Sequence, residues 1–200
     1  AGGEPLMNKT HFKWLSQLEE TSDTQLLYNT NGTFKPNQNE IDIWERFGGI
    51  WITFSIDSYE EKFEKLRVNA KWVNVLDNMK FITEEVCKKF KEHQPQTESM
   101  AIMTIHEENV MDIIELHEKL TENIDFMQQE PLNLNYLFYP EQRAIHNMST
   151  ERLDESIKHY EDNIHRLKEG RLKNDVIDLI NSMRTFIGDK IVAHNRPTGE

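Results

Sequence analysis

Residues 149–170 read STERLDESIKHYEDNIHRLKEG, and this stretch sets the interpretation of the rest of the chain. Its apolar side chains recur at the three- and four-residue spacing of one helix face, at Leu153, Ile157, Tyr160, Ile164 and Leu167. Ser149 or Thr150 suits the start of such a helix, and Gly170 suits its end. The stretch therefore predicts an amphipathic α-helix with one buried face.

The residues that follow predict a second long helix, from about Leu172 to His194. Its apolar stripe consists of Val176, Ile180, Met183, Ile187 and Ile191. His194 continues this stripe by one turn, and Asn195, Arg196 and Pro197 form a helix stop signal. We therefore expect His194 at the end of a buried helix face.

Two further helical regions are predicted upstream. Ser58-x-x-Glu61 and Thr104-x-x-Glu107 both match the capping box that opens a helix. The first region runs to His93, and a shift in its apolar register predicts a kink or two separate helices. Pro131 ends the second, and residues 132–148 are predicted to be a long connection that is functional or hides a short helix.

The N-terminal part of the chain is less regular. Residues 10–28 predict a weak helix, residues 29–40 a loop and residues 41–47 a short helix. Residues 50–56, IWITFSI, have the β-branched content of a strand. Because the sequence shows no partner strand, we interpret them as a buried helix or an extended core segment.

These regions together predict an all-α fold, an up-and-down four-helix bundle with an N-terminal helical extension. Residues 1–7 are interpreted as a probable cloning remnant, residues 8–195 as a single helical domain and residues 196–200 as a tail.

Charge and cysteine content exclude several classes of function. The net charge of −12, from 35 acidic and 23 basic residues, disfavours non-specific binding to nucleic acid and to anionic membranes. Cys87 is the single cysteine, so no intramolecular disulfide and no thiolate metal cluster can form. No apolar run is long enough to span a bilayer, and we expect a cytoplasmic protein without a membrane partner.

The sequence predicts neither a metal site nor a cofactor. His159, Asp162 and His165 resemble a ligand trio, but helical spacing points them in different directions. His117 lies in an apolar stripe, either as a hydrogen-bonded core histidine or as a functional group. No Gly-rich phosphate loop is present.

The string GDKIVAHN, residues 188–195, resembles the C-terminal motif of HEPN domains of the abortive-infection type. Asp189, Lys190, Ala193 and His194 match the family motif in order and spacing. The resemblance implies a small all-α bundle, a homodimer formed through the last helix, and metal-independent RNA cleavage by the 2′-hydroxyl of the RNA. The family's arginine would fall on Gly188 or Asp189, so this chain lacks it.

The leading hypothesis is therefore a HEPN-like protein of a prokaryotic or phage defence or toxin–antitoxin system, either a ribonuclease or a non-catalytic relative. His194 would assist proton transfer, and Lys190 or Arg184 would replace the missing arginine in stabilising phosphate charge. One alternative is an acidic, non-catalytic protein that binds or inhibits a protein partner. Another is a bundle that binds a metal or small ligand through His117.

Overall fold

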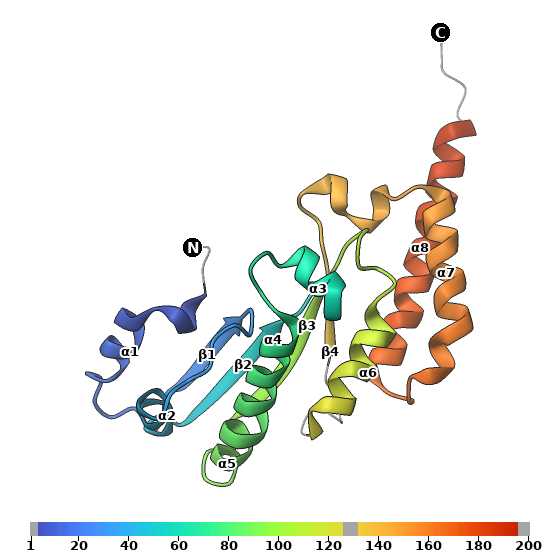
Figure 1. The fold of residues 1–200 in the computed structure, drawn as a ribbon. Helices are drawn as coiled ribbons and strands as arrows, with labels where there is room; N and C mark the ends of the chain where they lie inside the picture. The colour runs from blue at the N-terminus through green and yellow to red at the C-terminus, as the bar shows by residue number, and fades with distance from the viewer. Residues whose placement is uncertain (1–3, 126–131, 196–200) are drawn as a thin grey trace. The chain divides into compact units, whose positions relative to one another are not determined.

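The computed structural model describes residues 4–125 and 132–195, with side chains as far as Val192 (Figure 1). The strands are β1 (Gln25–Thr30), β2 (Gly49–Ser55), β3 (Glu98–Ile105) and β4 (Leu132–Tyr136). The α-helices are α1 (Lys9–Leu15), α2 (Gln38–Glu45), α3 (Glu60–Leu66), α4 (Trp72–Lys80), α5 (Lys88–Lys91), α6 (Ile113–Asn123), α7 (Thr150–Asn163) and α8 (Arg171–Asn195). A π-helical segment, η2 (Phe81–Cys87), joins α4 to α5, and short 3₁₀ turns are η1 (Pro5–Met7), η4 (Glu141–Arg143), η5 (Ile145–Asn147) and η6 (Ile164–Arg166).

The strands form one sheet, so the chain is an α/β protein and the prediction of an all-α helical bundle is wrong. The strand order is β1-β2-β3-β4, the same as the order along the chain. Strands β1, β2 and β3 run parallel, with Leu27 beside Trp51 and Thr53 beside Met100. Parallel neighbours need a crossover connection, and helices supply it between these strands.

The interpretation of residues 50–56 failed for a physical reason. These residues belong to β2, whose partners β1 and β3 lie far from it in sequence. A parallel pair is joined by a long crossover, so no turn signal lies beside the strand to announce its partner. The segment predicted as a weak helix, residues 10–28, holds most of α1 at its start but runs into β1 at its end, and the long connection, residues 132–148, contains β4.

Contacts within the chain group it into two compact units. The first consists of Ala1–Met103 and Leu116–Asn133, and the second of Thr104–Glu115 and Leu134–Glu200. The assignment of residues 8–195 to a single domain stays a prediction.

In the first unit, helices cover one face of the sheet. The Tyr28 hydroxyl on β1 accepts a hydrogen bond from Trp44 Nε1 on α2 at 3.2 Å. On β3, the Ser99 hydroxyl lies 3.2 Å from the Thr83 hydroxyl of η2. The buried side chains of β2 alternate along the strand at Ile50, Ile52 and Phe54. This alternation places them on the face that the helices cover.

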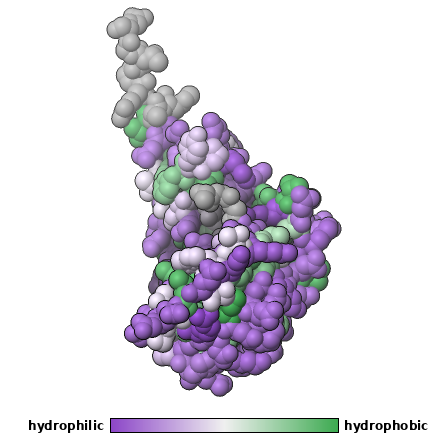
Figure 2. Space-filling view, turned by 90° about the vertical axis from the view of Figure 1, so that its left-hand side faces the viewer, coloured by the Kyte–Doolittle hydropathy of each residue, from purple (hydrophilic) through white to green (hydrophobic). Residues whose placement is uncertain are grey.

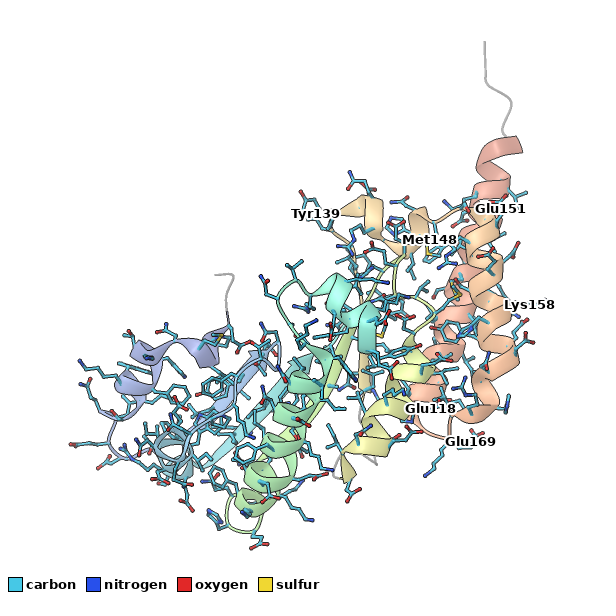
Figure 3. All side chains as sticks on the ribbon, in the orientation of Figure 1. Glu118, Tyr139, Met148, Glu151, Lys158 and Glu169 are labelled. Carbon is cyan, nitrogen blue, oxygen red and sulfur yellow. The ribbon has the colours of Figure 1, made fainter. Side chains whose placement is uncertain are left out.

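In the second unit, the predicted helices around residue 150 and residue 180 are both present. Ser149 caps α7 by accepting the backbone N–H of Arg152 at 3.2 Å, as the sequence predicted. Helices α7 and α8 pack side by side (Figure 1). Lys158 on α7 points away from α8 (Figure 3). The Tyr160 hydroxyl donates to the backbone carbonyl of Val110, which fixes α7 against the loop after β3.

Neither predicted capping box stands at the N-cap of a helix in the described residues. Helix α3 begins after Tyr59, which makes no side-chain capping bond. Thr104 lies within β3, and the N–H of Glu107 donates to the carbonyl of Arg143 at 3.0 Å. A four-residue pattern fits many backbone contexts, so it indicates a helix start only where the following residues also form a helix.

The separate helices expected in residues 59–93 are confirmed, because α3 and α4 are separated by residues 67–71. Among the described residues, no helix is both long and apolar enough to cross a bilayer. Figure 2 shows mostly hydrophilic residues on the viewed side, with hydrophobic residues in small separate patches.

Candidate functional site

The predicted catalytic residues of α8 are Arg184, Lys190 and His194, and the structure describes the side chains of the first two. The backbone of His194 belongs to α8, but its side chain lies outside the described residues. Lys190 lines a shallow depression of about 440 Å³ with His146, Phe186 and Asp189. Arg184 does not line this depression, because its guanidinium pairs with Glu161 on α7.

The buried stripe of α8 is shorter than predicted. Val176, Ile180 and Met183 are buried, but Ile191 is 53% exposed. Ile187, between them, is half-buried. Within the single chain the buried face therefore ends before Ile191, and burial of this end in a homodimer stays a prediction.

The histidines considered as metal ligands lie apart from one another. His159 Nε2 lies 3.8 Å from Glu115 Oε2, and Arg166 occupies the other oxygen of that carboxylate at 2.8 Å. A guanidinium at this carboxylate opposes cation binding. Within residues 4–125 and 132–192, no three His, Cys, Asp or Glu side chains come close enough to hold a metal ion.

The second face of the sheet is the feature that sequence reasoning missed. It carries the side chains that alternate with the buried ones, and we call it the uncovered face: Leu27, Asn29, Trp51, Thr53, Ser55, Met100, Ile102 and Asn133. Within the described residues, no hydrogen bond or ring contact joins these side chains to a helix. Leu27 is 71% exposed, whereas the side chains of β2 and β3 on this face are half-buried.

The register arranges these side chains in rows across the strands. Asn29, Thr53 and Met100 are neighbours on β1, β2 and β3. Asn133 on β4 extends the row, because its amide Nδ2 lies 3.0 Å from Met100 Sδ. The middle of the uncovered face therefore presents two amides, a hydroxyl and a thioether side by side, which can exchange hydrogen bonds with a polar organic molecule.

The neighbouring rows add apolar surface and one charged side chain, Glu98, which lies beside Trp51. Leu27 lies beside Trp51 towards the amino end, and Ser55 lies beside Ile102 towards the carboxyl end. The nearest charged side chain in register is Glu98, and Lys91 on α5 neutralises it at 3.8 Å. In a chain of net charge −12, this sparsely charged region is suited to a ring or an aliphatic group with a few polar atoms.

A pocket of about 460 Å³ lies beyond the carboxyl end of β1, in the same unit. Its lining includes Asn31 and Thr33, which follow β1, and Arg67 and Asn69, which follow α3. Asp57, just after β2, holds the Arg67 guanidinium with contacts of 2.7 Å to Nε and 2.6 Å to Nη2. The pocket and the Asp57–Arg67 pair lie beyond the carboxyl ends of β1 and β2, and the carboxyl edge of a parallel sheet is where ligands usually bind.

Strand-like alternation in residues 50–56 was the signal that could have revealed this site. Ile50, Ile52 and Phe54 alternate with more polar neighbours at the two-residue period of a strand with one exposed face.

No protein-family model matches the chain, and no curated protein matches its sequence.

Proposed function

We propose that the chain is a ligand-binding protein, which holds an uncharged ring or aliphatic part of a small organic molecule against the uncovered face of its open parallel sheet. The supporting observation is the row formed by Asn29, Thr53, Met100 and Asn133, on a face that no helix of the described residues contacts by a hydrogen bond or ring contact. Parallel sheets usually have both faces covered. A face that is half polar and open is therefore suited to a ligand rather than to a packed core.

The strand order has no reversal of the kind that a doubly wound sheet has. In a β/α barrel, successive strands are neighbours in chain order, whereas a doubly wound sheet reverses direction at a switch point. Here the order is β1-β2-β3-β4 without reversal. The helices α2 and η2, which follow β1 and β2, contact the same face through Trp44 and Thr83. The other face has no such helix contact among the described residues.

Tryptophan fluorescence tests this proposal, with nucleosides and aromatic amides as uncharged ring probes. We expect a probe to change the emission of the parent protein, and Trp51→Phe to remove that change. Trp14→Phe is the matched control, since Trp14 lies 56% exposed on α1. A response that persists in Trp51→Phe, or no response to any probe, would contradict the proposal.

The polar row is tested separately by Thr53→Val, which keeps the side-chain shape and removes the hydroxyl. One lost hydrogen bond of about 1.4 kcal/mol weakens binding about tenfold. We therefore expect the dissociation constant of a responding probe to rise by about this factor. An unchanged dissociation constant would exclude Thr53 from the site.

Metal-independent ribonuclease activity stays a prediction from the sequence, although the all-α fold that the HEPN resemblance implied is wrong. The homodimer through α8 also stays a prediction. An RNA-cleavage assay in EDTA, with His194→Ala beside the parent, tests the activity: cleavage by the parent alone would support it. The alternative of an acidic protein that binds a protein partner likewise stays a prediction, and pull-down of a basic partner would support it.

A further inference from the structure

The pocket beyond β1 contains a cation in an otherwise uncharged lining. Its lining residues are Met7, Asn31, Thr33, Phe63, Leu66, Arg67, Val68, Asn69 and Ala70. Arg67 is the one charged residue among them. Asp57, which pairs with this guanidinium, is not part of the lining, so the N–H groups of Arg67 are the charged donors that a negative group in the pocket would meet.

The Arg67 guanidinium is held in place before any ligand arrives. Asp57 Oδ2 accepts from Nε at 2.7 Å and lies 2.6 Å from Nη2. A guanidinium has five N–H donors, so these contacts leave donors for a second acceptor. Within the described residues, no hydrogen bond engages Nη1. The side chain of Arg67 is 33% exposed and that of Asp57 18%, which leaves the cation accessible from the pocket.

We propose that this pocket binds the carboxylate of a small organic acid through Arg67. An arginine fork matches the two oxygens of a carboxylate, and such charge-assisted bonds are stronger than neutral ones. The apolar side chains of Met7 and Leu66 in the lining suit the carbon skeleton of the acid, and the amides of Asn31 and Asn69 suit its other polar atoms. This inference rests on the proposed function, because it names the class of molecule, a small organic acid, that the same unit of the chain would bind.

Phenylacetate and phenylacetamide are matched probes, because they have the same ring and differ in the charge of one group. Calorimetric titration of the full chain should show phenylacetate binding about tenfold or more tightly than phenylacetamide. Arg67→Gln should remove this difference, whereas Arg152→Gln, which alters an exposed arginine of α7, should keep it. Equal affinities for the two probes in the parent, or a difference that persists in Arg67→Gln, would overturn the inference.

Arg67→Gln also deprives Asp57 of its partner, so a second variant separates binding from folding. Asp57→Asn removes the competing carboxylate and keeps the guanidinium, and we expect it to bind phenylacetate at least as tightly as the parent does. Loss of the preference for phenylacetate in a folded Asp57→Asn protein would contradict the inference. Failure of the proposed function is distinguishable, because it would appear as no effect of uncharged ring probes on Trp51.

Discussion

At the scale of single residues, the Tyr28 hydroxyl contacts two aromatic side chains, Trp44 and His11. It accepts from Trp44 Nε1 at 3.2 Å and lies 2.8 Å from His11 Nε2. Burial raises the pKa of Tyr28 to about 12, while the hydrogen bond from Trp44 acts in the opposite direction. The folded protein thus keeps the Tyr28 proton at pH values where an unfolded chain, with a tyrosine pKa near 10.0, releases it.

The free energy of unfolding should therefore fall as the pH rises from 10 towards 12. Tyr28→Phe should reduce this alkaline decline and should cost about 1–2 kcal/mol at pH 7, since the buried Trp44 N–H loses its acceptor. Urea unfolding of the parent and the variant at pH 7, 10 and 12 measures the cost at neutral pH and the alkaline decline. Tyr139→Phe, at an 85% exposed position, is the control, and an equal alkaline decline in Tyr28→Phe would contradict the assignment.

Cys87 gives a second prediction at this scale. Burial raises the pKa of its thiol to about 12, so almost no thiolate is present near neutral pH. We expect the native protein to resist an aromatic disulfide reagent at pH 8 and to react stoichiometrically once urea unfolds it. Rapid reaction of the native protein would show that Cys87 is accessible.

The sequence identifies Cys87 as the single cysteine, and the structure buries it in η2. It could not identify Arg67 as a pocket residue. The contact between Asp57 and Arg67 depends on how the chain turns after β2, and a ten-residue separation within a polar segment has no recognisable pattern.

At the scale of elements, the turn after β1 depends on a glycine. Gly32 has a φ of +76°, and a Cβ there would lie 2.8 Å from Val75 Cγ1 on α4. Gly32→Ala should therefore destabilise the protein by about 1–3 kcal/mol, from backbone strain and overpacking together.

Gly188→Ala is the matched control, because Gly188 lies in α8 and nothing is within 4 Å of a Cβ there. Alanine favours a helix over glycine by about 1 kcal/mol, so this variant should be more stable than the parent. Thermal unfolding of both variants tests the pair. Equal stability of Gly32→Ala and the parent would show that α4 does not pack against this turn.

Helices were easier to predict than strands because their signal is local. The cap at Ser149 and the buried stripe of Leu153, Ile157 and Tyr160 lie within one stretch of sequence and are confirmed, although α7 ends at Asn163, before the end predicted at Gly170. Strand β2 shows its alternation just as locally, but a strand is stable only with partners that the sequence does not place beside it. For this reason the all-α interpretation outweighed the strand-like pattern of residues 50–56.

At the scale of the whole molecule, the parallel sheet predicts a pattern of amide exchange. Strand β2 is paired on both sides, and Ile50, Ile52 and Phe54 are fully buried. Its amides should exchange more slowly than those near the end of α8, where Ile191 and Val192 are exposed. Hydrogen exchange with mass spectrometry measures this, and fast exchange throughout residues 49–55 would contradict the sheet.

The uncovered face could not be predicted from composition, because it gathers residues from four strands. Asn29, Thr53, Met100 and Asn133 are unremarkable where they stand in the sequence. They become neighbours only through the parallel register and the strand order. The net charge of −12 likewise did not indicate that one face of the sheet is nearly free of charge.

Ligand binding to the uncovered face can be measured by chemical-shift mapping of the labelled protein with a library of uncharged ring compounds. Compounds that bind should shift the Trp51 indole and the Asn29 and Asn133 side-chain amides, which lie on the uncovered face. Shifts confined to α7 and α8, with Trp51 and these amides unchanged, would contradict the proposed function.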